Sequence, residues 1–75
     1  MTEIITIVEG VNPDMDEAGA LAGELFNQGV LEAFVSGDIV RPATTVDGIE
    51  VACPVANVPR VKETFQEAGF KTIPD

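Results

Sequence analysis

The sequence predicts an α+β fold in which two helices cover one face of an antiparallel sheet. Short runs of β-branched residues alternate with two longer segments of helical periodicity, and each helical segment begins near a proline and ends at a glycine. Residues 24–34 and 63–73 also resemble each other, because both place phenylalanine two residues after glutamate and glycine before an apolar tail. A chain of 75 residues that repeats itself in this way predicts two similar halves.

The first half opens with a strand and a helix. Residues 2–9 are rich in β-branched side chains and carry apolar residues on both faces, as a strand buried on two sides does. Residues 12–29 have an apolar stripe at helical spacing. We expect Asn12 to cap this helix, Pro13 to occupy its first position and Gly29 to end it.

A second strand and a connection follow. Residues 30–36 alternate apolar and polar side chains, which predicts a strand. Residues 37–48 contain Gly-Asp, Arg-Pro and Asp-Gly pairs, and such pairs are typical of turns. We therefore expect a connecting loop from 37 to 48 between the two halves, with extended ends as an open possibility.

The second half repeats the order. Residues 49–55 predict a third strand that ends near its proline, since proline cannot donate to a ladder. Residues 56–69 predict the second helix, with Asn57 as its cap and Pro59 in its first turn. Residues 70–73 are a candidate for a short last strand.

These elements predict one domain over residues 1–75 with a ferredoxin-like βαββαβ arrangement, a two-layer sandwich of an antiparallel sheet and two helices on one face. The alternative is a three-stranded βαββα form in which the last segment does not pair. An open sheet face with apolar residues is what an oligomer buries. We expect a homo-oligomer formed through Ile4, Val8, Phe34 and Ala52, with Ile5 and Ile7 as the alternative pair from the first strand.

The charge is acidic and uneven. Thirteen acids and four bases give a net charge of −9, and eight of the acids precede Arg41, the first base. Such a field repels nucleic acid and anionic lipid and suits a basic protein partner, although it also describes a merely well-solvated surface. We expect no direct nucleic-acid or membrane binding. The apolar runs are short, Met1 begins no basic leader and Cys53 is a single cysteine, so we expect a cytoplasmic protein.

The chemistry of enzymes is poorly represented. The chain has no histidine, tyrosine or tryptophan, which removes the commonest general base and metal imidazole. Cys53 lies on the apolar face of an expected strand and is expected in the core. Asn12, Asp14 and Asp16 begin like a calcium loop, but Glu17 stands where glycine is required. We expect no enzyme activity and no metal site.

The segments "NQGVLEAFV" and "IEVACPVANVPRVKETFQEAG" resemble the small prokaryotic signal-transducing proteins that have a PII-like, ferredoxin-type fold. The resemblance covers most of the chain and rests on packing residues: Leu21, Leu25, Gly29, Leu31, Ala33, Val35, Val51, Val55, Val58 and Pro59. It implies a regulatory role and a partner-contacting loop between the two halves. Nucleotide-binding PII proteins use basic residues, whereas here Glu9, Asp14 and Asp16 would meet the phosphates, so we expect no cofactor.

The resulting functional prediction is a non-enzymatic regulatory or protein-binding module that acts through an oligomer and a loop over residues 37–47. In that loop Asp38, Ile39, Val40 and Arg41 place two aliphatic side chains between opposite charges, as a contact point would. Near the start of the second helix, Arg60 and Lys62 are a candidate anion site. The alternative is a small acidic inhibitor, of phage origin for example, that mimics nucleic acid and binds a basic protein. Its acidic strip would be Asp16, Glu17, Glu24 and Glu32.

Overall fold

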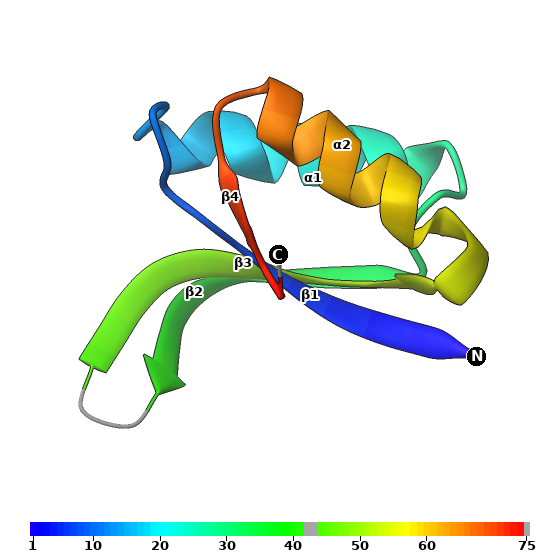
Figure 1. Cartoon of the computed structure of the whole chain (residues 1–75), viewed down its shortest axis with the longest axis horizontal. Coiled ribbons are helices and arrows are strands. Elements are labelled where there is room, and N and C mark those ends of the chain that lie inside the picture. The colour runs from blue at the N-terminus through cyan, green and yellow to red at the C-terminus, as the bar shows by residue number, and fades with distance from the viewer. Residues whose placement is uncertain (42–43, 75) are drawn as a thin grey trace.

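The computed structural model describes residues 1–41 and 44–74 and has α+β architecture (Figure 1). In chain order the elements are β1 (Thr2–Val8), α1 (Met15–Asn27), β2 (Ala33–Arg41), β3 (Thr44–Pro54), the short 3-10 helix η1 (Val55–Asn57), α2 (Val58–Glu67) and β4 (Lys71–Ile73). The four strands form one antiparallel sheet in the order β2-β3-β1-β4, and both helices lie on the same face of it. The predicted α+β class, with an antiparallel sheet and two helices, and the short last strand are confirmed.

The pairing register divides each strand between two faces. Ile5 lies opposite Val51 and Ile7 opposite Ile49, and all four side chains are at most 1 % exposed beneath the helices. The alternate residues of β1 and β3 point to the other side of the sheet, which we call the open face because neither helix covers it.

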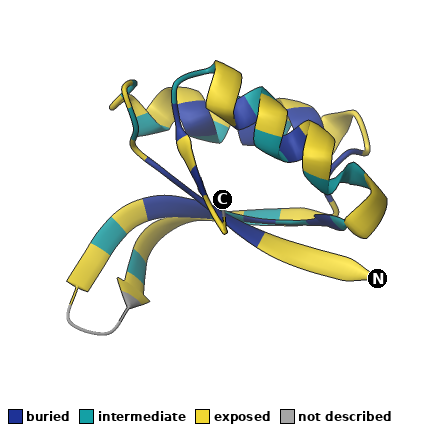
Figure 2. Cartoon of the chain, in the orientation of Figure 1, coloured by how far each residue is buried: buried dark blue, intermediate teal, exposed yellow. Residues whose placement is uncertain are grey.

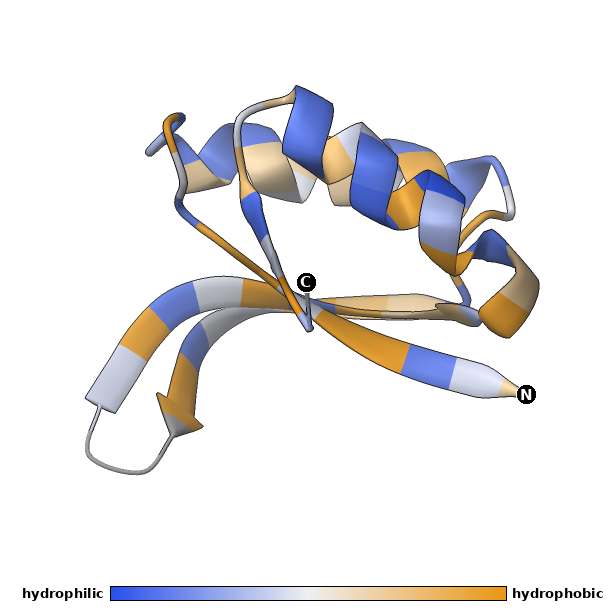
Figure 3. Ribbon diagram, viewed as in Figure 1, coloured by the Kyte–Doolittle hydropathy of each residue, from blue (hydrophilic) through white to orange (hydrophobic). Residues whose placement is uncertain are grey.

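The core lies between the helices and the sheet. Figure 2 shows buried residues on the sheet-facing sides of α1 and α2, and Figure 3 shows hydrophilic residues on the outer side of α2. Phe65 is its largest fully buried side chain. The remaining members are Ile5, Ile7, Ala18, Ala22, Leu25, Val30, Leu31, Ile49, Val51, Cys53, Val61 and Phe70. None of the helices described is long and apolar enough to cross a bilayer.

The start of α1 differs from the prediction. Asp14, not Asn12, caps the helix, because its carboxylate accepts hydrogen bonds from the backbone N–H groups of Asp16 and Glu17 at 3.1 and 3.2 Å. The side chain of Asn12 lies two residues earlier, where its oxygen accepts from the Asp14 N–H at 3.0 Å. Both residue types cap helices well, so the sequence alone did not separate them. Pro13 consequently precedes the helix.

Both helices end in the same way, which accounts for the glycine that residues 24–34 and 63–73 share. Gly29 and Gly69 have φ of +80° and +95°, and the residue after each donates its backbone N–H to a carbonyl five residues earlier, from Val30 to Leu25 and from Phe70 to Phe65. This is the Schellman geometry of a glycine-terminated helix. The two halves therefore align at their glycines, so that Leu25 corresponds to Phe65.

The loop predicted over residues 37–48 is wrong for its described part, where the chain takes the extended form that was left as a possibility for its ends. β2 continues to Arg41 and β3 begins at Thr44, with Gly37 directly opposite Gly48 in the ladder. Residues 42 and 43 lie outside the described chain. The glycine at 48 serves close packing rather than a turn, because a Cβ there would lie 2.9 Å from the carbonyl oxygen of Ile7. The long β2–β3 hairpin extends past the helices and curves away from them (Figure 1).

The second strand also starts later than predicted, at Ala33 rather than residue 30. Val30 and Leu31 are buried at 4 % and 3 % exposure, but they belong to the link between α1 and β2. Because Leu31 precedes the strand, an alternation counted from Leu31 does not show on which face of the sheet Phe34 lies. Phe34 pairs with Val51 and turns toward α1, where its ring packs edge-on against Phe26 with centroids 5.8 Å apart.

A set of hydrogen bonds joins the start of α1 to the end of α2. The Asn12 N–H donates to the carbonyl of Gly69 at 2.9 Å, and its side-chain amide donates to the carbonyl of Ala68 at 3.1 Å. Gly10 fits between these segments only because it lacks a side chain, since a Cβ there would lie 2.4 Å from the Gly69 oxygen.

Candidate functional site

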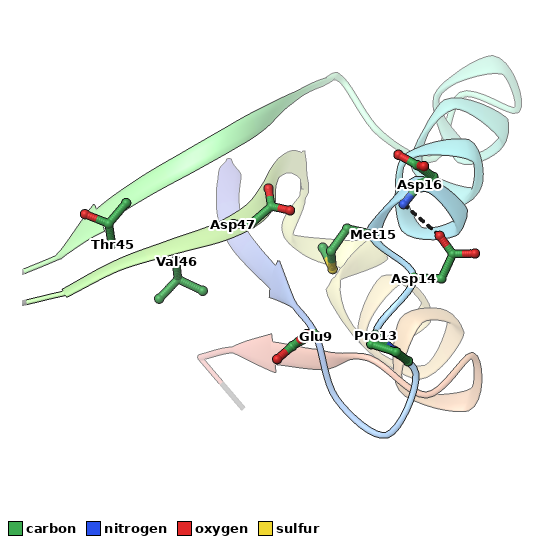
Figure 4. A pocket seen from close by; sticks show the side chains of 8 residues that line it. All are labelled: Glu9, Pro13, Asp14, Met15, Asp16, Thr45, Val46 and Asp47. Atoms are coloured by element: carbon green, nitrogen blue, oxygen red, sulfur yellow. Dashed lines mark hydrogen bonds between the residues drawn. The ribbon is translucent and has the colours of Figure 1, made fainter.

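A wide concavity lies at the end of the molecule where the β1–α1 connection, the start of α1 and β3 meet (Figure 4). It is an open depression of about 550 Å³ with four carboxylates among its lining residues. We call this set the acidic depression. The described residues that line it include no base, and they are Glu9, Pro13, Asp14, Met15, Asp16, Thr45, Val46 and Asp47.

Each carboxylate reaches the depression for a separate structural reason. Glu9 follows the end of β1, and Asp14 is held in place by its capping bonds to α1. Asp16 lies in the first turn of α1, where the helix dipole favours negative charge. Asp47 lies on β3, on the helix side of the hairpin, directly opposite Asp38 of β2.

Two of these residues connect the depression to a second one. Asp16 and Asp47 also line an adjoining hollow of about 280 Å³, whose floor includes Gly19, Ser36 and Ile49. Like charges directly opposite each other in a ladder are destabilising, so the Asp38–Asp47 pair does not serve the stability of the hairpin.

The acidic depression does not have the geometry of a metal chelate. Among the residues described, no three carboxylate or cysteine side chains converge closely enough to hold a metal ion. The carboxylates are instead spread around a wide, open rim. Such an arrangement suits several cationic groups on a complementary protein surface better than a single ion.

The predicted contact loop lies on β2 instead, close to the hairpin tip. Val40 is 79 % exposed, and Asp38 is exposed opposite Asp47. Ile39 is half-buried on the open face, where its Cδ1 would lie 3.1 Å from a Cβ at position 48. Arg41 is the last residue of the strand. Asp38 and Val40 lie on the helix side of β2, whereas Ile39 lies on the open face. These three residues therefore do not form one contact surface.

The predicted oligomer face requires one correction. Ile4 and Ala52 do lie opposite each other on the open face, with Ile4 62 % exposed. Val8 also points to the open face but is only 9 % exposed, and the side chains of both Val8 and Ile39 lie beside Gly48. Phe34 belongs to the helix side, so its inclusion was wrong. The homo-oligomer itself stays a prediction.

The predicted anion site is not assembled. Arg60 and Lys62 lie two residues apart on α2, and side chains at that spacing do not face each other on a helix. Arg60 instead donates from Nη2 to the side-chain oxygen of Gln28 at 3.4 Å, which ties α2 to the end of α1.

Cys53 is in the core, as predicted. It is fully buried on the helix side of β3. Burial raises the pKa of its thiol, and the neighbouring carboxylates of Glu3 and Glu32 raise it further. The thiolate, which is the nucleophilic form, is therefore disfavoured in the folded chain.

Two residues that the sequence analysis did not select are notable on the open face. Thr6 lies directly opposite Glu50 at the centre of the sheet, and Thr6 is only 5 % exposed. The signal that could have found them is the alternation within residues 49–55, where a glutamate stands among β-branched residues. Asp47 was also missed, because it was assigned to a loop.

Comparison of the chain with models of protein families, with curated proteins and with solved structures returned no match. The resemblance to the small PII-like proteins accordingly stays a prediction.

Proposed function

We propose that the protein is a non-enzymatic regulatory module that binds a basic partner protein through the acidic depression. The observation that carries this proposal is the gathering of Glu9, Asp14, Asp16 and Asp47 around one open concavity with no base among its described lining residues. The net charge of −9 would also steer a basic partner toward the protein over a longer range.

The proposal extends to the fold family. We assign the chain to the ferredoxin-like arrangement, and two features support this: the sheet order β2-β3-β1-β4 and the placement of both helices on one face. A PII-like signalling role would fit this arrangement, since its partner contacts would then come from the segment between the two halves. Here that segment is the β2–β3 hairpin, which supplies Asp47 to the acidic depression.

The absence of an enzymatic role is also proposed. Cys53 is the only thiol of the chain, and burial keeps it protonated and away from substrate. The chain has no histidine to act as a general base near neutral pH. The carboxylates of the acidic depression are suited to recognition, because they lie spread along its rim.

The experiment is affinity capture from a lysate of the source organism with four immobilised proteins: wild type, Asp16→Asn, Asp47→Asn and the control Glu24→Gln. Glu24 is exposed on α1 away from the acidic depression, so the control makes the same charge change elsewhere. We expect a basic protein to be retained by wild type and by the control, to be depleted with either aspartate variant, and to elute as salt is raised. Equal capture by all four proteins would refute the proposal.

The alternative of a nucleic-acid mimic is tested in the same experiment. Glu17 and Glu24 of α1 lie beside Glu67 of α2 along a shallow groove between the helices, which gives this alternative some support. However, Glu17 accepts a hydrogen bond from the side chain of Asn12 at 2.7 Å, and Glu32 accepts one from Thr2 at 2.6 Å. Displacement of the captured protein by DNA, with loss of capture in Glu24→Gln, would favour the mimic.

A further inference from the structure

The outer edge of β2 is unpaired. β2 and β4 are the two edge strands of the sheet, and within the described chain β2 pairs with β3 alone. Short length, lysine and proline are the devices that keep a natural sheet edge from pairing. β4 has all of them, since it is 3 residues long, includes Lys71 and is followed by Pro74. β2 has none of them over its 9 residues, and the far part of the β2–β3 hairpin extends past the helices (Figure 1).

Alternate residues of β2 turn their backbone groups toward this edge. The N–H of Val55, directly after β3, donates to the carbonyl of Met1 at 3.0 Å, and hydrogen-bonded pairs alternate along an antiparallel ladder. The odd-numbered residues of β3 therefore bond to β1, and its even-numbered residues bond to the odd-numbered residues of β2. The N–H and carbonyl groups that point outward belong to the other residues of β2, which are Phe34, Ser36, Asp38 and Val40.

The outward backbone groups are complementary to those of a second copy. A two-fold axis through Gly37 would place two copies of β2 antiparallel and overlap them along their whole length. In this register Phe34 lies opposite Val40 of the second copy, and Ser36 lies opposite Asp38. Each outward N–H and carbonyl group then meets an outward group of the other copy, as the hydrogen-bonded pairs of an antiparallel ladder require.

The apolar side chains of β2 also match in this register. Val40 is 79 % exposed in the single chain and would be covered by Phe34, whose ring already packs against Phe26. Val35 is 64 % exposed and would lie opposite Ile39 on the open face. Aromatic and β-branched residues that face each other across two strands stabilise the pairing. The exposed aliphatic side chains of the edge therefore find apolar partners in a second copy.

Asp38 disfavours the neighbouring registers. The smallest shift that keeps the outward groups paired displaces one copy by two residues. In one direction this shift places Asp38 opposite Asp38 of the second copy, where like charges repel. In the other direction it places Asp38 opposite the ring of Phe34. The register centred on Gly37 instead gives the carboxylate a donor, because the exposed hydroxyl of Ser36 lies opposite it.

We propose that two copies of the chain pair through the edges of β2, in the register centred on Gly37, and join their four-stranded sheets into one. This contact is an edge and differs from the face-to-face oligomer expected from the sequence. The described residues that line the acidic depression lie outside β2, so this proposal and the proposed function can fail independently. Each copy carries a net charge of −9, so added salt should tighten the dimer by screening repulsion, whereas it should release a basic partner.

The first test measures the association of the wild-type protein. Sedimentation velocity over a concentration series should show a transition from the 7.9 kDa chain to a species of twice that mass, at lower concentration when salt is raised. Amide hydrogen exchange followed by nuclear magnetic resonance locates the contact. The amides of Phe34, Ser36, Asp38 and Val40 should become protected as concentration rises. Those of Val35 and Ile39, which bond to β3, should be protected throughout and serve as the internal control.

A proline variant tests the backbone contact. Ser36→Pro removes an outward N–H that β3 does not use, and proline is tolerated at such positions of an edge strand. Each dimer would lose two hydrogen bonds, so we expect association roughly tenfold weaker or more. Ser36→Val is the matched control, because it keeps the N–H and favours a strand, and it should still dimerise. Far-ultraviolet circular dichroism verifies the fold of both variants.

A cysteine pair tests the register. Residues 35 and 39 of facing copies would form a non-hydrogen-bonded pair with Cα atoms about 4.5 Å apart, which is within the range of a disulfide. Within one copy they are about 13 Å apart along the strand, which is too far. Oxidation of Val35→Cys/Ile39→Cys with copper phenanthroline should therefore give a covalent dimer, and oxidation of Val35→Cys alone should give little.

Three outcomes would overturn the proposal. A wild-type protein that stays monomeric across the series would leave the edge of β2 to a strand of another protein. A dimer that Ser36→Pro does not weaken would show that the contact lies elsewhere, on the open face for example. A dimer whose cysteine pair does not cross-link would contradict the register centred on Gly37.

Discussion

Thr6 and Thr72 allow the effect of an unpaired buried hydroxyl on this fold to be measured directly. Both are 5 % exposed and they lie on neighbouring strands, but their environments differ. The hydroxyl of Thr72 accepts a hydrogen bond from Nε2 of Gln66 at 2.8 Å on the helix side of the sheet. The hydroxyl of Thr6, on the open face, has no such bond with any residue that the structure describes.

The same substitution should therefore have opposite effects at the two positions. Thr6→Val removes a polar group whose desolvation is uncompensated, a penalty of about 1–3 kcal/mol, so the free energy of unfolding should rise by about 1 kcal/mol. Thr72→Val removes a made hydrogen bond, so the free energy of unfolding should fall by about 0.5–1.5 kcal/mol. Valine keeps the β-branched shape that favours a strand at both sites, so propensity cancels.

The assay is urea denaturation and thermal melting followed by far-ultraviolet circular dichroism, because the chain has no tryptophan or tyrosine for fluorescence. For a domain of 60–100 residues, 1 kcal/mol corresponds to a shift of about 4–8 °C in Tm. The denaturant midpoint should move without a change in slope, since the exposed surface hardly changes. If Thr6→Val lost as much stability as Thr72→Val, the Thr6 hydroxyl would be satisfied, and the expected difference between the two positions would be refuted.

Three other predictions concern packing, charge and the thiol. Gly10→Ala should lower the free energy of unfolding by more than about 1 kcal/mol, because the new Cβ would meet a backbone oxygen at 2.4 Å. Gly23→Ala inside α1 should raise it by about 0.5–1 kcal/mol, because the nearest atom to its Cβ would be 3.8 Å away. Chemical denaturation of both variants measures these changes. Asp47→Asn should raise stability by a few tenths of a kcal/mol by relieving the repulsion from Asp38, and the same denaturation curves would contradict this if stability fell. Cys53 should react with Ellman's reagent only on unfolding. Because its folded pKa is raised, the folded chain binds more protons, so stability should decline as pH rises above the ordinary thiol range, and Cys53→Ala should remove that decline.

The overall layout was predictable because local signals and burial agreed. Gly29 and Gly69 each end a helix at a position that requires positive φ, and no other residue type adopts that conformation as readily. The core positions of β3 followed from its alternation, whereas β1 carries apolar residues on both faces and its sequence did not show which set is buried. The presence of the helices and strands could therefore be predicted, because the helix of each half ends at a glycine with positive φ.

The hairpin could not be read correctly because its glycines have two explanations. Gly37 and Gly48 flank dipeptides that are typical of turns, and only the tertiary pairing shows them opposite each other in a ladder. The close approach that requires Gly48 comes from Ile7, which is 41 positions away in the chain numbering and gives no local signal. Placing that stretch in a loop also hid Asp47.

The candidate sites were predictable in charge but not in position. The excess of acids in the first half indicated Glu9, Asp14 and Asp16, but the fourth lining acid comes from the second half through strand pairing. Thr6 and Glu50 are 44 positions apart in the chain, and their pairing depends on the register between β1 and β3. In the same way, the face on which Phe34 lies depends on where β2 begins. A shift of one residue in register would move every side chain of a strand to the opposite face of the sheet. The face on which a residue lies is therefore what the sequence predicts least well.

The bonds from Asn12 to Gly69 and Ala68 bear on how the chain melts. An amide in an exposed connection would ordinarily exchange with solvent hydrogen through local fraying, yet this one is held by the far end of the polypeptide. Its release requires the exit of α2 to separate from the entry of α1. The two halves should therefore lose their structure as a single cooperative unit, and neither half should persist as a folded intermediate.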